Sequence, residues 1–141
     1  MFTTIVVALD GSEYSDRALD LAMDIARKYA AKLHLIHVNN VQEIFISFGG
    51  ASALIKPEDY EKPGQEILAL ASQKATSCGC VVDTHQLDGD HARAVLDKVE
   101  ALSADLIVVG SKGHSDISGI LLGSVSHKIT HLAPCPCLIA R

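Results

Sequence analysis

The stretch that decides the fold is an apolar run followed by a glycine-punctuated loop: Asp105-Leu106-Ile107-Val108-Val109-Gly110-Ser111-Lys112-Gly113, then nine residues, then Gly123-Ser124-Val125-Ser126. The short apolar run predicts a strand that is buried on both faces, as in the middle of a parallel sheet. Glycine at position 110 lets the backbone take positive φ and lets a ligand approach without meeting a Cβ atom. Gly123 should open a helix whose free N–H groups attract anions. The stretch therefore predicts a strand, a phosphate-binding loop and a helix start.

Two better-known phosphate loops do not match this stretch. The chain has no G-x4-G-K-[ST], which excludes a P-loop lysine, and no G-x-G-x-x-G after its first strand, which excludes a dinucleotide fingerprint. The spacing present is G-x2-G-x9-G-[ST]. The alternative is a helix-capping loop without a ligand, because glycine and serine also serve turns and caps.

Length and composition favour one domain over residues 1–141. A chain of this length that is 48% hydrophobic can bury a core without disulfides or metal. The net charge of −5, with no basic cluster longer than Arg27-Lys28, argues against a nucleic-acid partner. The apolar runs fall short of the roughly 20 residues of a membrane span, and the first residues lack a secretory signal. We therefore expect a cytosolic protein that does not insert into membranes.

Apolar strands alternate with amphipathic helices along the whole chain, which predicts an α/β fold with a mostly parallel sheet. The expected strands are residues 5–9, 33–38, 80–87, 105–109 and 137–140, and the expected helices are about 15–31, 64–77, 91–103 and 124–132. Five strands with right-handed crossovers form a doubly wound sheet, whose ligands bind beyond the strand carboxyl ends where the winding reverses. Residues 41–63 fit no regular element. They could cover a ligand or partner, or form a plain surface loop with a short helix.

Candidate metal ligands are few. The cysteines form two C-x-C pairs, Cys78/Cys80 and Cys135/Cys137. Zinc sites usually use C-x2-C to C-x4-C spacing, so we interpret the second pair as small apolar residues. His127 and His131 lie four apart on a helix, but no Asp or Glu in the same turn supplies a third ligand. Solvated or packed histidines are therefore favoured there.

Four motifs share the pattern of one family. They are Ile5-Val6-Val7-Ala8-Leu9-Asp10-Gly11-Ser12, Leu87-Asp88-Gly89-Asp90-His91-Ala92, Val108-Val109-Gly110-Ser111-Lys112-Gly113-His114, and Leu122-Gly123-Ser124-Val125-Ser126 with the later Pro134-Cys135-Pro136. On these motifs the chain resembles the universal stress protein family, and the glycine spacing resembles its ATP-binding branch. The resemblance implies a single-domain, Rossmann-like, adenine nucleotide alpha-hydrolase-like fold with a five-stranded parallel sheet in the order 3-2-1-4-5. It also implies a homodimer through the C-terminal strand, which would otherwise be a short apolar sheet edge.

The resemblance implies roles for individual residues. Asp10 matches the aspartate that hydrogen-bonds the adenine side, Val38 matches the valine whose backbone meets the base, and Gly110 matches the position beside the ribose. The other predicted contacts are Ala8 and Leu9 in the base pocket, and Gly113, His114, Gly123, Ser124, Val125 and Ser126 around the phosphates. Asp10 could instead be a turn residue beside Gly11. Ala8 departs from the family pattern, because nucleotide-binding relatives often have proline there.

The function that the resemblance implies is that of an ATP-binding stress-response protein, with Mg²⁺ held mainly by phosphate oxygens. We expect a nucleotide-dependent regulatory module acting on a partner that the sequence does not identify. An enzyme is not expected, because the loop supplies donors without an evident base nearby. Two alternatives stay open. One is a slow ATPase or autophosphorylating phosphotransferase with Ser124 or Ser126 as acceptor, and the other is a nucleotide-free dimerisation module.

Overall fold

The computed structural model describes residues 1–40, 49, 56–113 and 121–141. Within them, five strands form one parallel sheet in the order β3-β2-β1-β4-β5. The strands are β1 (Thr4–Ala8), β2 (Lys32–Asn39), β3 (Val81–Asp88), β4 (Leu106–Gly110) and β5 (Cys137–Ala140). The predicted α/β class, doubly wound parallel sheet and strand order are confirmed. With one exception, the elements begin and end within about two residues of their predicted bounds.

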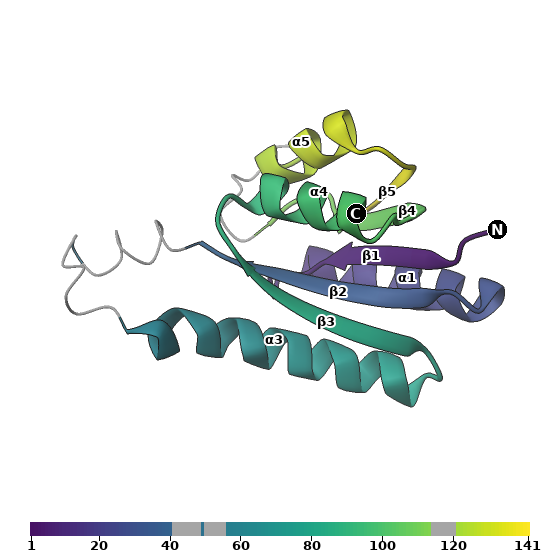
Figure 1. Cartoon of the computed structure of the whole chain (residues 1–141), viewed down its shortest axis with the longest axis horizontal. Coiled ribbons are helices and arrows are strands. Elements are labelled where there is room, and N and C mark those ends of the chain that lie inside the picture. Colours follow the sequence, from purple (N-terminus) through teal and green to yellow (C-terminus); the bar gives the residue numbers. More distant parts are fainter. Residues whose placement is uncertain (41–48, 50–55, 114–120) are drawn as a thin grey trace.

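Helices cover both faces of this sheet (Figure 1). The helices are α1 (Glu13–Tyr29), α3 (Pro57–Ser77), α4 (His91–Ala101) and α5 (Ser124–Leu132). On one face, α1 and α3 pack against the sheet, and on the other face α4 and α5 lie side by side. Because each face is covered, the molecule has two apolar cores separated by the sheet.

The central strand β1 is apolar without interruption because neither of its faces meets water. Ile5 and Val7 belong to the core under α1 and α3, whereas Val6 belongs to the core under α4 and α5. All three side chains are fully buried. The strand β4 follows the same alternation, with Val108 on the first face and Ile107 on the second.

The exception among the boundaries is α3, which begins at Pro57, seven residues before its predicted start. The last part of segment 41–63 is therefore helical, which corrects its interpretation as wholly irregular. Proline suits the first helical position, where its missing N–H is not needed. The carboxylate of Asp59 accepts the main-chain N–H of Lys56 at 2.9 Å. Pro63 hid this start, because a proline inside a helix removes a main-chain hydrogen bond and usually ends the helix.

Gly110 ends β4 against the first turn of α1, and its φ is not positive, so the structure does not use the freedom of glycine to adopt positive φ here. A Cβ atom added to Gly110 would lie 2.8 Å from both the main-chain carbonyl carbon and the Cβ of Tyr14. Non-bonded carbon atoms do not approach so closely. The packing of β4 on α1 therefore requires glycine at this position, whether or not a ligand is present.

Two histidines pair across β2 and β3. Nδ1 of His34 lies 3.0 Å from Nε2 of His85, and the rings stack with their centroids 5.2 Å apart. A single proton between these nitrogens satisfies both of them. Burial lowers the pKa of both imidazoles, and the nearby cations Lys32 and Lys98 lower it further, while Asp83 opposes the change.

We predict that Gly110→Ala lowers the free energy of unfolding by about 1–3 kcal/mol, because the new methyl group overpacks the contact with Tyr14. Urea denaturation followed by circular dichroism measures this change. An unaltered free energy of unfolding would show that α1 can move away from β4 without cost.

The histidine pair should make stability depend on pH. The folded-state pKa values lie below the unfolded value of about 6.5, so the unfolded chain binds protons first as the pH falls. The free energy of unfolding should be highest above pH ~6.5 and should decrease as the pH falls through that value. Urea denaturation at pH 7.5 and 5.5 should show this decrease, and it should be smaller in the double variant His34→Leu/His85→Leu. Equal pH dependence in the two proteins would contradict the assignment.

Candidate functional site

A cavity of 330 Å³ opens at the carboxyl ends of β1, β2 and β4, on the face of the sheet that α4 and α5 cover. This is where a doubly wound sheet is expected to bind its ligand. The predicted site residues that line it are Ala8, Leu9, Asp10, Val38, Gly110, Gly113, Ser124, Val125 and Ser126. Gly123 does not line the cavity but caps α5, and His114 lies outside the described residues. The structure thus gathers most of the predicted residues around one space.

The end of β1 contributes Asp10, which also shapes the turn into α1. Its Oδ1 atom accepts the main-chain N–H of Ser12 at 2.9 Å, while Gly11 adopts a φ of 83°. Ser12 then caps α1 by accepting the main-chain N–H of Ser15. Asp10 therefore acts as a turn residue and lines the cavity as well. Its contact with adenine stays a prediction.

The start of α5 supplies main-chain donors to the cavity. Gly123 is the cap residue, with φ −69° and ψ 161°, and it provides no side-chain cap. The first helical hydrogen bond runs from the N–H of His127 to the carbonyl of Gly123. The N–H groups of Ser124, Val125 and Ser126 come before this bond, so helix geometry gives them no carbonyl within α5. Such a helix start attracts anions through its free donors and its positive dipole end.

Two short hydrogen bonds hold this helix start against β4. The Ser126 hydroxyl donates to the carbonyl of Gly110 at 2.6 Å, and the N–H of Gly123 donates to the carbonyl of Ser111 at 2.6 Å. The hydroxyl hydrogen of Ser126 is therefore engaged within the protein. A phosphate contact by Ser126 would use its main-chain N–H, whereas the exposed Ser124 has its hydroxyl at the cavity wall.

The floor of the cavity is apolar, and our sequence analysis assigned only its residues Ala8 and Val38 to the site. It is formed by apolar side chains from three strands and two helices, all of them buried except the partly buried Ala8. They are Ala8, Ile36, Val38, Val95, Val109 and Ile129. Most of these residues belong to the core under α4 and α5. The strand and helix patterns indicate core positions for most of them, but only the assembled fold shows that they reach a cavity.

Polar residues at the end of β2 form a further part of the wall that the sequence did not reveal. Nδ1 of His37 lies 2.8 Å from the carbonyl of Leu9. Because a carbonyl only accepts, His37 carries its proton on Nδ1, and the Nε2 of the neutral ring is then an acceptor. Asn39 and Asn40 line the cavity beside it. No family motif in the sequence included these residues.

The first turns of α3 complete this side of the cavity with Asp59, Tyr60 and Pro63. A glycine lets the helix approach the sheet here. A Cβ atom added to Gly64 would lie 2.5 Å from Cδ2 of His37. The wall could not be predicted, because the sequence interpretation started the helix after these residues.

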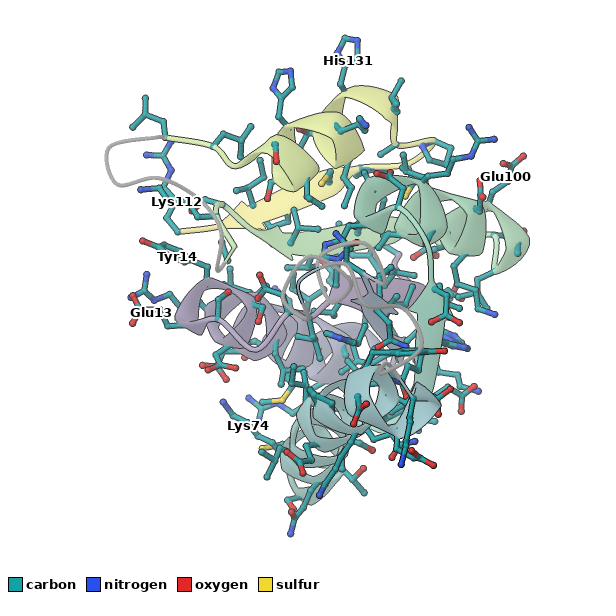
Figure 2. All side chains as sticks on the ribbon, turned by 90° about the vertical axis from the view of Figure 1, so that its left-hand side faces the viewer. Glu13, Tyr14, Lys74, Glu100, Lys112 and His131 are labelled. Atoms are coloured by element: carbon teal, nitrogen blue, oxygen red, sulfur yellow. The ribbon has the colours of Figure 1, made fainter. Side chains whose placement is uncertain are left out.

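A cation lies in the wall of the cavity. Lys112, which lines the cavity, holds its Nζ 5.8 Å from the ring centroid of Tyr14, and the guanidinium of Arg17 lies 5.2 Å from the same centroid. Figure 2, which looks toward the carboxyl ends of the strands, shows Lys112 and Tyr14 together at one side of the molecule. Contacts of this kind orient a flexible lysine.

The candidate metal ligands lie apart from this cavity. The rings of His127 and His131 stack with centroids 6.2 Å apart on the exposed side of α5. All four cysteines are free, and burial raises the pKa of Cys137 to about 11. Within the described ranges, no group of three or more His, Cys, Asp or Glu residues could hold a metal ion. Among the described helices, none has the length and apolar character that crossing a bilayer requires.

Comparison with known proteins assigns the family. The chain matches the universal stress protein family over residues 1–141. It is 35% identical over 150 residues to the universal stress protein YxiE of Bacillus subtilis and 32% identical over 143 residues to a universal stress protein of Thermus aquaticus, with 100% of both chains covered in each case. It is also similar to a crystal structure of a universal stress protein in complex with cAMP, at 29% identity and a TM-score of 0.77, which covers 99% of this chain and 97% of that one. The chain belongs to the universal stress protein family.

Proposed function

We propose that this protein binds ATP in the cavity and acts as a nucleotide-dependent regulatory module rather than as an enzyme. The observation that supports this best is that one cavity combines an apolar floor with the free N–H groups of a helix start. Its volume of 330 Å³ falls in the range of about 300–1,000 Å³ that is usual for small-molecule sites. The cAMP complex of a similar protein supports an adenine nucleotide as the ligand class.

The two ends of the cavity suggest the orientation of the nucleotide. The phosphates would lie at the start of α5, where the N–H groups of Ser124 and Val125 and the ammonium of Lys112 attract negative charge. The base would lie on the apolar floor between Ile36 and Val95, near the end of β2. Magnesium would depend mainly on phosphate oxygens.

Two contacts favour binding over turnover. The Ser126 hydroxyl already donates to Gly110, so accepting a phosphoryl group would first require that bond to break. Oδ1 of Asp10 already accepts a main-chain N–H, which reduces its capacity as a base. A single-turnover assay that detected phosphate release in the wild type, but not in Ser124→Ala, would favour the ATPase alternative.

We also propose a homodimer through β5. The N–H of Ile107 donates to the carbonyl of Pro136, and the N–H of Ser111 donates to the carbonyl of Ala140. Since successive residues of a strand point their main-chain groups to opposite sides, Cys137 and Ile139 face away from β4. These groups form the edge of the described sheet, and an unpaired edge favours addition of another strand.

Isothermal titration calorimetry with ATP and magnesium should show saturable binding to the wild type. Lys112→Gln should weaken ATP binding about threefold and AMP binding less, because fewer phosphate charges lie near the lysine; added salt should reduce the difference. Lys28→Gln is the matched control, since Lys28 lies in the last turn of α1, near the amino ends of the strands and away from the cavity. The absence of saturation at millimolar ATP would refute the proposal and favour a nucleotide-free module.

Sedimentation equilibrium should give twice the mass of one 15.0 kDa chain. Ile139→Pro removes an edge N–H without removing a bond to β4, so this variant should sediment as a folded monomer. The circular dichroism spectrum checks that the variant is folded. A variant that remained dimeric would place the interface elsewhere.

A further inference from the structure

His91 is the first residue of α4 and lines the same cavity. Its Nε2 atom is buried, and no hydrogen-bond partner for it exists in the described part of the chain. Buried polar atoms are nearly always paired in native proteins, because an unpaired one has lost its hydrogen bonds to water without replacement. The imidazole of His91 therefore requires an explanation.

The helix start does not supply that explanation. The side chain of Asp90 caps α4 by accepting the main-chain N–H of Arg93 at 3.1 Å. The first helical turn is thus satisfied without His91. Leucine or phenylalanine would fill the same space without a buried polar atom, so the fold alone gives no reason for histidine here.

The connection between β3 and α4 places His91 at the base end of the cavity. The N–H of Gly89 approaches the carbonyl of Asn39 at 3.4 Å, which ties this connection to the end of β2. Val95, one helical turn after His91, belongs to the apolar floor. The start of α5, with its anion-attracting N–H groups, lies beyond β1 on the side of β4 and β5.

We propose that His91 is a base-recognition residue whose Nε2 hydrogen-bonds the edge of the nucleobase. Because Nε2 is buried here while the residue lines the cavity, the ring has to turn to bring this atom to the base. This inference rests on the proposed function. A neutral imidazole nitrogen can donate or accept one hydrogen bond, according to its tautomer. The edge of adenine offers ring nitrogens as acceptors and an exocyclic amine as donor, so either tautomer of His91 finds a partner on the base.

Titration calorimetry with ATP and with AMP tests this contact in three variants. His91→Phe keeps an aromatic ring but lacks the nitrogen, and it should weaken both nucleotides about tenfold, because both contain the same base. His91→Gln places an amide nitrogen near the position of Nε2 and should retain most of the affinity. His131→Phe is the matched control, because His131 is exposed and points away from the molecule on α5 (Figure 2). It should bind as the wild type does.

A melting experiment separates this role from a structural one. Without nucleotide, His91→Phe should melt at the same temperature as the wild type or higher, because it removes an unpaired buried polar atom. A lower melting temperature would indicate that His91 supports the fold. Analogues of ATP whose base lacks one heteroatom identify the contacted atom. The analogue that lacks this atom should bind the wild type more weakly than ATP does, whereas His91→Phe should bind the analogue and ATP equally.

The failure of this inference is distinguishable from the failure of the proposed function. Equal ATP affinity in the wild type and His91→Phe would overturn the role of His91 and leave nucleotide binding intact. No binding by the wild type would overturn both. If His91→Phe does not fold, the imidazole ¹⁵N resonance of His91 in the wild type decides: a shift of Nε2 at saturating ATP supports the contact, and an unmoved resonance overturns it.

Discussion

The parallel pairing of β1 with β4 is the constraint on which the site depends. Their register, with Val7 opposite Val108, brings the two strand ends to the same edge of the sheet. The chain leaves β1 toward α1 on one face and leaves β4 toward α5 on the other. Because the two connections diverge, a space is left between them, and the carboxyl ends of β1 and β4 both border this space. A turn carboxylate and a helix start therefore meet at one cavity although more than a hundred residues separate them.

The glycines and serines of the loop have structural tasks as well as their predicted ligand contacts. Gly110 is required because Tyr14 occupies the space that a Cβ atom would need. Ser126 fixes α5 to the end of β4 through its hydroxyl. The described residues at the two ends of this loop are held by contacts within the protein, so a bound phosphate would meet donors there that need little rearrangement. The same residues therefore contribute to stability and to the proposed binding, and a loss of affinity in a loop variant needs a stability measurement beside it.

The sequence was sufficient for the fold because the signals were local and strong. Apolar runs such as the one that ends at Gly110 are too short to be buried helices and therefore indicate strands. Amphipathic stretches of helical period separate these runs. What escaped prediction depends on contacts across the chain. The start of α3 was hidden by Pro63, whose effect on a helix depends on its surroundings. The proposed role of His91 follows from its place at the cavity and from its buried, unpaired Nε2 atom, which no spacing rule contains.

The connection between the cavity and β5 gives the regulatory proposal a physical route. The main-chain carbonyl of Ser111 accepts from Gly123 at the start of α5, and the N–H of the same residue donates to Ala140 at the end of β5. One peptide segment thus contacts both the proposed phosphate site and the proposed dimer edge. Regulation through this segment requires that it adopt two arrangements that the nucleotide binds with different affinity, because contact by itself transmits nothing. Ser111 is almost fully buried, and both its N–H and its carbonyl are hydrogen-bonded. A second arrangement of this segment would therefore have to break one of the two hydrogen bonds. Loss of the bond to the carbonyl of Ala140 would alter the proposed dimerisation, because that bond holds the end of β5.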